Sequence, residues 1–295
     1  MLVVALAFAS IGCREAPAPT GAQTPSAAIH VVRDAVNREV RVPASPKRIV
    51  SLAPAITEIL FAVGAGDRVV GVTRYCNFPE AAAVLPRVGG FADPDVERVA
   101  QLAPDLVIAT ADTVGRDRFD ALVALGIPVY ATDAADFAGV AASIRAVASV
   151  AGNAEAGDVL AKAFEARFSA VAEKVKGRPR TRVLFLFQAN PAIAAGKGTF
   201  LDELVRLAGG DNVAVTAPTA YPRLGLEGII ALAPERILTT MPETAETLRA
   251  SLAKSPIPAE RITPVEADLV ERPGPRLVDG LERVAAILHP DAFSK

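Results

Sequence analysis

The sequence contains few of the residues on which catalysis and nucleic-acid binding depend. Tryptophan is absent, and histidine occurs only at His30 and His289. So little histidine argues against a zinc hydrolase, a histidine-rich metal receptor and most histidine-based catalysis. Aromatic residues make up 5%, and 31 basic against 33 acidic residues give a net charge of −2, so the chain lacks the stacking platform and basic surface of a nucleic-acid binder. No apolar run reaches the roughly 18 residues of a spanning helix, so we expect no integral membrane segment in the mature protein.

The motifs of phosphate-binding and hydrolytic enzymes are also missing. Residues 195–199 read AGKGT, but Pro191 stands where a phosphate-binding loop needs glycine, and Gly198 follows Lys197 where serine or threonine is required. No Gly-x-Ser-x-Gly elbow occurs, and neither histidine lies in a polar cluster. We therefore predict no catalytic residue, no metal and no resident cofactor. An α/β enzyme is an alternative that would need a convergent acid/base pair.

What the chain does have is globular composition, with 295 residues of which 51% are hydrophobic and 22% charged. At roughly 150 residues per domain, this length predicts about two domains. Strands alternate with helices in both halves, which is typical of a parallel α/β sheet. We expect strands at residues 48–53, 69–73, 106–110, 127–132 and 182–187, and helices at about 56–63, 94–102 (capped by Asp93) and 199–208.

The N-terminus has the pattern of a targeting segment. Residues 1–12 are apolar and end in small residues before Cys13, which resembles the end of a secretory signal and the cleavage box of bacterial lipoproteins. No basic residue precedes the apolar run, and Ser10 stands where that box usually has leucine. We expect Cys13 to carry a lipid, residues 13–45 to form a flexible tether, and the protein to lie in the periplasm or at the outer face of the cytoplasmic membrane. The alternative is a buried N-terminal strand with an incidental cysteine.

A repeat links the two halves of the chain. Residues 96–105 align with residues 226–235, because in both segments apolar residues fall at i, i+3, i+4 and i+7 and Leu-Ala-Pro precedes an acidic residue. Glu97 and Glu227 lie one step off the apolar face, so we expect them near the surface. The repeat predicts two similar α/β lobes with mainly parallel sheets, at residues 46–152 and 179–295.

The segment between the lobes, residues 153–178, keeps a helical period of apolar residues. About 23 helical residues at 1.5 Å each would span roughly 35 Å, the width of a small domain. A single stiff helix joining the lobes predicts little closure on a ligand, whereas a hinge of loops would allow more. The alternative is that this helix only ends the first lobe and is followed by a loop.

Three regions together resemble a known family: residues 48–73, the segments around Glu97 and Glu227, and residues 196–212. They are similar to the class III substrate-binding proteins of bacterial ABC importers, and the resemblance covers about residues 48–288. It implies two α/β lobes joined by one backbone helix, with cobalamin, haem or a ferric siderophore bound in the cleft between them. It also implies a monomeric receptor without enzymatic activity that serves a permease dimer and its cytoplasmic ATPase.

Within that family the cobalamin receptors look closest. Their Gly-Val-x-x-Tyr-x-x-Tyr/Phe-Pro segment is matched by residues 71–79, and their Asp-x-x-Glu-Arg-x-x-Pro-Arg loop by residues 268–276. A corrin is a broad disc with apolar faces and an amide rim, so flat aromatics can cover the faces while charged side chains bond the rim. The resemblance therefore implies cobalamin or a related corrinoid as the transported ligand, held by Tyr75, Phe91, Ile193, Tyr221, Asp268, Leu269, Val270, Glu271 and Arg272.

Departures from the cobalamin pattern leave other ligands open. The cobalamin receptors often have tryptophan where this chain has Phe91, Thr110 and Tyr221. Haem receptors place their axial tyrosine where Phe78 stands, which cannot ligate iron, although Tyr75 could substitute for it. Siderophore receptors favour clustered arginines, of which none is obvious here. A haem or ferric-siderophore receptor is the alternative function, and ordinary half-buried loop aromatics are the alternative interpretation of both tyrosines.

By the same resemblance, Glu97 and Glu227 dock the receptor on its permease. In the family, one glutamate on each lobe pairs with arginines of the two permease subunits. Two like anchors suit a two-fold partner, and arginine–carboxylate pairs give orientation as well as energy. The alternative is two solvated helix carboxylates.

Cys76 has no disulfide partner if Cys13 carries a lipid. We interpret it as a small buried residue. The alternative is a thiol beside the cleft that contacts cobalt.

Overall fold

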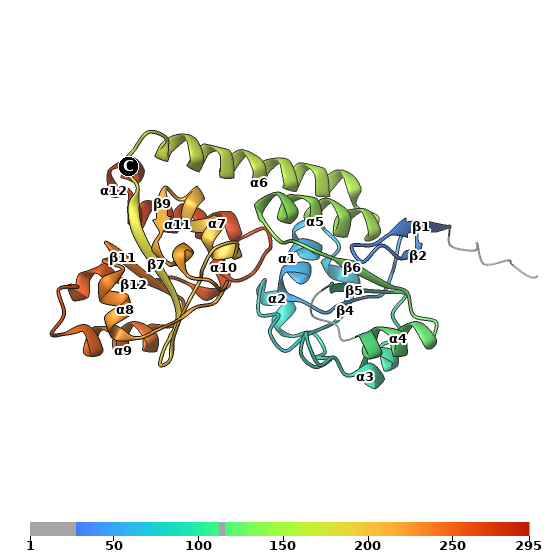
Figure 1. The fold of residues 1–295 in the computed structure, drawn as a ribbon. Coiled ribbons are helices and arrows are strands. Elements are labelled where there is room, and N and C mark those ends of the chain that lie inside the picture. The colour runs from blue at the N-terminus through green and yellow to red at the C-terminus, as the bar shows by residue number, and fades with distance from the viewer. Residues whose placement is uncertain (1–27, 112–115, 295) are drawn as a thin grey trace, which may run out of the picture.

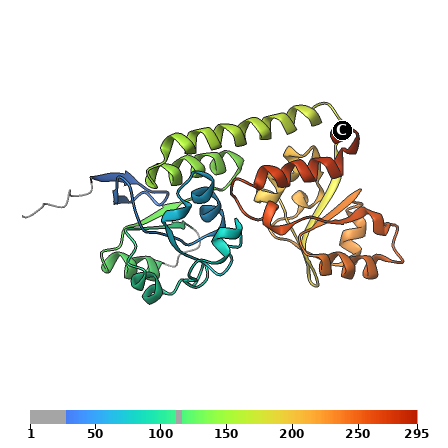
Figure 2. The ribbon, with the colours of Figure 1, turned by 180° about the vertical axis from the view of Figure 1, so that it is seen from behind.

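The computed structural model describes residues 28–111 and 116–294. The expected signal segment, Cys13 and most of the expected tether therefore lie outside the described residues. The rest forms two α/β lobes side by side, with helix α6 (Ala154–Val175) running along one side of both (Figure 1). Seen from behind, the lobes again lie next to each other under this helix (Figure 2). The expected two-lobe α/β fold is confirmed.

The first lobe is built on a parallel four-stranded sheet in the order β4-β3-β5-β6. Its strands are short and apolar, and they are almost wholly buried because helices cover the sheet. The elements are β3 (Ile49–Ser51), α1 (Pro54–Ala62), η1 (Gly66–Arg68), β4 (Val69–Val72), α2 (Glu80–Ala83), α3 (Val96–Gln101), β5 (Leu106–Thr110), α4 (Arg116–Ala124), β6 (Val129–Thr132) and α5 (Phe137–Val150).

The second lobe is built around the long strand β7 (Thr181–Ala189). One side of β7 pairs in parallel with β11; the other pairs in parallel with β9 at its start and antiparallel with β8 at its end. The sheet is therefore mainly parallel, with an antiparallel edge of β8 and β10. Its other elements are β8 (Ala192–Ala194), α7 (Phe200–Leu207), β9 (Gly210–Asn212), η2 (Val213–Thr216), β10 (Arg223–Leu224), α8 (Leu226–Ala231), β11 (Arg236–Thr239), α9 (Pro242–Leu252), η3 (Ala259–Arg261), β12 (Ile262–Pro264), α10 (Ala267–Val270), α11 (Leu277–Leu288) and α12 (Pro290–Phe293).

Before the first lobe's sheet comes a hairpin where the sequence predicted tether. Strands β1 (Ile29–Arg33) and β2 (Glu39–Pro43) pair antiparallel. Val40 and Val42 are buried in the core, and the carboxylate of Asp34 holds the turn by accepting the backbone N–H of Arg38 at 2.8 Å. The predicted tether is therefore wrong for residues 29–43, because alternating valines make β2 a strand with one buried face.

Helix α6 connects the lobes as a rod. Its 22 residues span about 33 Å at 1.5 Å per residue. It packs on α5 of the first lobe, where Arg145 binds Glu165 at 2.7 Å, and on α11 of the second, where Arg167 binds Glu282 at 2.8 Å. The alternative, a helix that only ends the first lobe, does not hold. Neither α6 nor any other helix within residues 28–111 and 116–294 is long and apolar enough to cross a bilayer.

One hydrophobic core continues from lobe to lobe beneath α6. At its centre Phe137 of α5 stacks on Phe200 of α7, with ring centroids 5.4 Å apart and ring planes 6° from parallel. Phe164 and Phe168 of α6 pack against the same ring. Because this joint is apolar and close-packed, we expect the lobes to move together rather than as independent bodies.

Candidate functional site

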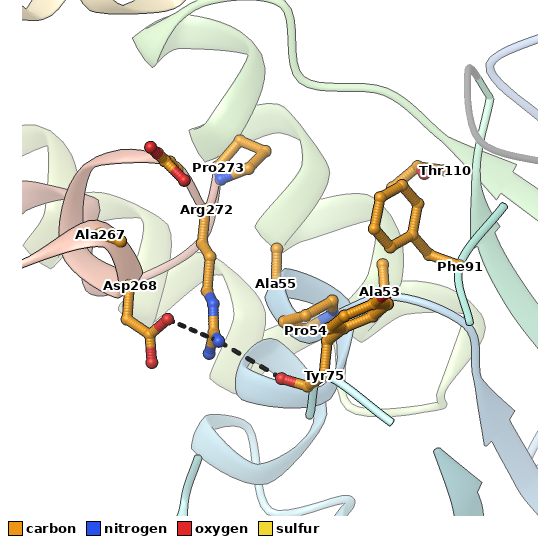
Figure 3. Close-up of a pocket in the computed structure, with 11 residues that line it drawn as sticks. Ala53, Pro54, Ala55, Tyr75, Phe91, Thr110, Ala267, Asp268, Arg272 and Pro273 are labelled. Atoms are coloured by element: carbon orange, nitrogen blue, oxygen red, sulfur yellow. Dashed lines mark hydrogen bonds and ion pairs between the residues drawn. The ribbon is translucent and has the colours of Figure 1, made fainter. Parts of the chain in front are cut away.

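A cleft between the lobes opens into two adjoining cavities of about 420 Å³ and about 600 Å³. Glu271 and Pro273 border both cavities, so the loop after α10 divides the cleft. The first cavity has walls from both lobes, as Figure 3 shows, with Tyr75 and Phe91 facing the Asp268–Pro273 loop. It is lined by Ala53, Pro54, Ala55, Tyr75, Phe91, Thr110, Ala267, Asp268, Glu271, Arg272 and Pro273.

The first lobe contributes an aromatic wall. Tyr75 and Phe91 lie in loops that follow β4, with ring centroids 5.5 Å apart, and 45% and 39% of their surfaces are exposed. Arg74 braces this wall: its guanidinium lies 5.6 Å from the Tyr75 ring and binds Asp93 at 2.8 Å. That hydrogen bond from Arg74 lowers the pKa of Asp93 below its ordinary value. Two large rings with exposed faces are suited to covering a flat apolar ligand.

The second lobe lines the larger cavity. Tyr221 is 58% exposed there and packs on Phe187 at a centroid distance of 5.8 Å. Val270 also borders this cavity, with almost all of its surface buried. Tyr221 therefore lies across the dividing loop from the pair Tyr75 and Phe91, and the three rings border one cleft.

The segment from Asp268 to Arg276, which contains most of α10 and the connection to α11, makes several hydrogen bonds and ion pairs at the cleft. Arg272 binds Asp268 at 2.6 Å within the loop, and it crosses to the first lobe to donate to the side chain of Asn77 at 2.6 Å and the carbonyl of Tyr75 at 3.3 Å. Figure 3 shows the Arg272 side chain between Asp268 and Tyr75. Asn77 in turn donates to Asp268 at 3.0 Å. The floor of the cleft is thus cross-linked between the lobes.

The cleft is acidic. Within the described residues, the charged side chains that line its two cavities are Asp133, Asp268, Glu271 and Arg272. The guanidinium is bound to Asp268 and to Glu58, a buried residue of α1. A ligand therefore meets carboxylates at Asp133 and Glu271 without a free cation beside them in this lining, which favours a neutral or cationic ligand over an anion.

Most of the predicted site residues come together here, and two do not. Tyr75, Phe91, Asp268, Glu271 and Arg272 line the first cavity, and Tyr221, Val270 and Glu271 line the second. Ile193 instead lies in β8 opposite Arg223 of β10, and Leu269 packs against the core.

Sequence reasoning missed four polar residues of this region, namely Glu58, Asn77, Asp133 and Arg276. Asp133 follows β6 directly, just as Leu52 and Ala53 follow β3 and Ala111 follows β5. Ligands of open parallel sheets bind at the carboxyl ends of the strands, so the strand ends alone would have pointed to Asp133. Glu58 carries no comparable signal, because its partners lie more than 200 residues away in the chain.

Cys76 lies behind the aromatic wall rather than in the cleft. It is fully buried, with its sulfur 3.2 Å from the hydroxyl of Thr57 and 3.1 Å from that of Thr73. Its interpretation as a small buried residue is confirmed. Among the described residues, no group of three or more His, Cys, Asp or Glu side chains is placed to hold a metal ion.

The sequence repeat is also a structural repeat. Helices α3 and α8 have equal length, and each ends before an alanine, Ala103 or Ala233, with φ of 44°. In each lobe an arginine closes the end of the helix: Arg48 donates to the carbonyl of Leu102 at 2.7 Å, and Arg182 to that of Leu232 at 2.6 Å.

In each lobe, the acidic residue after the repeated Leu-Ala-Pro accepts a hydrogen bond from the backbone of the same arginine. Asp105 accepts the backbone N–H of Arg48 at 2.9 Å, and Glu235 that of Arg182 at 2.8 Å. Glu97 and Glu227 occupy the exposed first turns of the two helices, which lie on the parts of the lobes remote from α6 (Figure 1). The two glutamates thus stand at equivalent places in the two lobes.

Residues 49–262 match the family described as periplasmic binding protein, which is well over half of the chain. The chain belongs to the periplasmic binding protein family. It is thus an extracytoplasmic receptor that delivers a ligand to an ABC importer, and not an enzyme.

Individual relatives of this periplasmic binding protein differ in what they bind. It is 33% identical to YvrC of Bacillus subtilis, named as an uncharacterized ABC transporter substrate-binding lipoprotein, over 90% of this chain and 87% of that one. It is 27% identical to the vitamin B12-binding protein BtuF of Vibrio cholerae, with a TM-score of 0.74 over 85% and 99% of the two chains. It is 28% identical to the heme-binding protein BhuT, solved with two hemes, with a TM-score of 0.75 over 85% and 100%. Overall similarity therefore does not separate a B12 ligand from haem.

Proposed function

We propose that this periplasmic binding protein carries cobalamin or a related corrinoid in its interlobe cleft. The observation that carries the proposal is the chemistry of the lining: exposed aromatic faces at Tyr75, Phe91 and Tyr221, and carboxylates at Asp133 and Glu271. The aromatic faces match the apolar faces of a corrin, and the carboxylates accept hydrogen bonds from the amide N–H groups of its rim.

The charge of the cleft favours a corrinoid over haem and ferric siderophores. Haem carries two propionate carboxylates, and ferric siderophores are commonly anionic, so both need cations in the site. The cation of this lining, Arg272, is occupied by Asp268 and Glu58. A corrin with neutral amides on its rim places no anion against Asp133 and Glu271.

The residue at the position of the axial tyrosine of haem receptors supports the same choice. Phe78 has no ligating atom, and the guanidinium of Arg276 lies over its ring, 3.9 Å from the centroid. That face of Phe78 is therefore occupied by a protein cation rather than open to a ligand.

Haem is the second candidate, and one observation favours it. The half-exposed Tyr75 and Tyr221 border the cleft from opposite lobes, and a phenolate oxygen is an established axial ligand for haem iron. The haem proposal therefore needs a tyrosine hydroxyl for binding, whereas the corrinoid proposal needs only the aromatic faces.

Delivery completes the proposed function. We propose that Glu97 and Glu227 bind arginines on the two subunits of the permease, and that a lipid on Cys13 keeps the receptor at the membrane. Support for the first comes from the matched exposure of the two glutamates and from the matched arginine contacts at the ends of their helices. Support for the second comes from the segment before Cys13 and from the lipoprotein name of YvrC.

Calorimetric titration of the full chain, with Cys13→Ser to prevent lipidation, tests the ligand directly. Cyanocobalamin and haemin are run in parallel at the same protein concentration. Saturable binding of cyanocobalamin at about one per chain, with micromolar or tighter affinity, is the expected result. If the protein binds haemin and not cyanocobalamin, its role as a receptor stands and the corrinoid proposal is wrong. If it binds neither, ferric siderophores are titrated next.

A further inference from the structure

A cluster of three charged residues, with a buried carboxylate at its centre, joins the two lobes beside the first cavity. Glu58 lies in α1 of the first lobe, and only 2% of its side chain is exposed. Its carboxylate accepts two hydrogen bonds from Arg276, at 2.7 Å and 3.0 Å, and a longer one from Arg272 at 3.4 Å. Both arginines belong to the second lobe, in the connection between α10 and α11. We call these three residues the interlobe latch.

The latch is satisfied only when the lobes are together. A buried carboxylate without a partner is strongly unfavourable, and a bidentate arginine is the partner that compensates it best. The hydrogen bonds to the Glu58 carboxylate come from the second lobe. The same pairing raises the pKa of Arg276, chiefly through its hydrogen bond to Glu58. Parting the lobes would break the hydrogen bonds that Arg272 and Arg276 donate to Glu58.

The backbones of the two lobes approach each other closely beside the latch. A Cβ built on Gly274 would lie 3.2 Å from the Cα and Cβ of Ala55 in α1, which is tighter than ordinary van der Waals contact. Gly274 has no positive φ, so its missing side chain serves this close approach rather than an unusual backbone conformation. The two lobes therefore touch at the latch.

The latch also reaches the ligand site. Through Arg272 it is connected to Asp268, to the side chain of Asn77 and to the carbonyl of Tyr75. Both Nη atoms of Arg272 are thereby engaged by protein atoms. The resemblance assigns this guanidinium to the ligand, whereas the geometry gives it the task of holding Asp268 against the Tyr75 loop.

We propose that Glu58 is a positioning residue of this receptor: through Arg272 and Arg276 it fixes the separation of the lobes, and with it the width of the cleft. The inference rests on the proposed function only in that the cleft is the ligand site. It holds for a corrinoid or for haem alike.

The test measures lobe separation without any ligand. Spin labels are placed at Val84→Cys in the first lobe and Lys197→Cys in the second, both exposed positions, in the full chain with Cys13→Ser. Glu58→Gln is compared with Glu165→Gln, which removes an equally short arginine pair that does not cross between the lobes. We expect a longer or broader distance distribution for Glu58→Gln and an unchanged one for Glu165→Gln. An unchanged distribution for Glu58→Gln would overturn the proposal.

Ligand affinity gives the second readout. Well below the unfolding midpoint, Glu58→Gln should weaken cyanocobalamin binding by about tenfold or more, because one partner of a buried charge pair is removed. Full affinity in Glu58→Gln would contradict the positioning role. If the wild type binds no cyanocobalamin, the corrinoid proposal fails while the distance readout still decides the latch. If Glu58→Gln does not fold, Gly274→Val, which forces the contact with Ala55 apart, is judged by the same two readouts.

Discussion

At the scale of single residues, Tyr75 distinguishes the two candidate ligands. The corrinoid proposal uses the face of its ring, which Tyr75→Phe keeps and Tyr75→Ala removes. We expect Tyr75→Phe to bind cyanocobalamin as the wild type does, and Tyr75→Ala to bind it about tenfold more weakly, or about 1.4 kcal/mol. Calorimetric titration measures both. If the wild type binds haemin and Tyr75→Phe does not, and neither of these two proteins binds cyanocobalamin, the hydroxyl of Tyr75 is instead an iron ligand.

The limits of sequence reasoning are clearest at Arg272. Family resemblance in the Asp268–Arg276 segment predicted that Arg272 holds the ligand, and the structure places Arg272 in the lining of the first cavity. What the guanidinium binds was not predictable, because Glu58 is 214 residues away and sits among the apolar residues of α1. The same helical period that indicates burial of Ile56, Ile59 and Leu60 gives no sign that a carboxylate between them is buried as well.

Ala103 and Ala233 give a residue-scale prediction about stability. Both have φ of 44°, a left-handed conformation that costs a side-chain-bearing residue about 1–2 kcal/mol. Ala103→Gly and Ala233→Gly should therefore each raise the free energy of unfolding, by about 0.5–1 kcal/mol after the greater entropy of glycine in the unfolded chain is subtracted. Denaturant unfolding measures the change.

The matched control for these glycines is Ala100→Gly, inside α3. There the backbone is helical, so the same substitution should lower the free energy of unfolding by about 1 kcal/mol. If Ala100→Gly and Ala103→Gly change the free energy of unfolding in the same direction, the left-handed conformation of Ala103 does not decide the effect.

At the scale of elements, the strands and helices that pattern predicted are present with different ends, but the hairpin of β1 and β2 was missed. The expected helix at 94–102 begins only at Val96, because Asp95 rather than Asp93 caps it, accepting the N–H of Arg98 at 3.0 Å. Asp93 was the plausible cap by sequence, but its carboxylate is engaged by Arg74. Two aspartates flank Pro94, and only the tertiary contact of the first decides which one caps the helix.

The ion pairs between α5 and α6 predict a pH dependence. Hydrogen bonds from Arg145 lower the pKa of Glu165 below 4.5, and those from Lys162 and Arg145 lower that of Asp158 below 3.8. A carboxyl whose pKa is lower in the folded state stabilises fully above its unfolded pKa, and that stability is lost as pH falls through the folded pKa. The thermal midpoint of the wild type should therefore fall more steeply than that of Arg145→Gln as pH drops below about 4.5.

Arg178→Gln is the control for this acid dependence. Arg178 is exposed and donates to the carbonyl of Lys174 rather than to a carboxylate, so its loss should leave the acid slope unchanged. Thermal unfolding, followed by circular dichroism at several acidic pH values, gives the dependence of the thermal midpoint on pH for the wild type, Arg145→Gln and Arg178→Gln. Parallel curves for the wild type and Arg145→Gln would show that this pair contributes nothing measurable, as is common for exposed pairs.

At the scale of the whole molecule, the internal repeat was the most informative sequence feature. It predicted two lobes, and the structure extends it to the supporting contacts of Arg48 and Arg182. The cleft between the lobes was predictable only through family resemblance, because its walls combine loops from both halves. Its acidity was not foreseen, since the charge of a lining depends on which guanidinium is already paired.

Docking is a prediction about the whole molecule, because it needs both lobes to present their glutamates to one partner at once. Each charge-assisted pair fixes orientation, and a rigidly joined pair of anchors engages a two-fold permease only if both fit. Charge reversal of both, Glu97→Arg with Glu227→Arg, should abolish ligand uptake by cells. The affinity for cyanocobalamin should stay at the wild-type value, because both glutamates lie outside the cavities.

The controls for docking reverse one exposed carboxylate in each lobe on the side of α6: Asp67→Arg in η1, next to Arg68 that binds Asn153 before α6, with Asp291→Arg in α12, which packs on the end of α6. This double variant makes the same change in net charge and should transport normally. Uptake assays with labelled cyanocobalamin and calorimetry on the purified variants supply the two readouts. Equal loss of uptake in test and control variants would point to net charge rather than docking. A parallel loss of affinity in Glu97→Arg with Glu227→Arg would refute the docking role, because the glutamates would then act on the cleft itself.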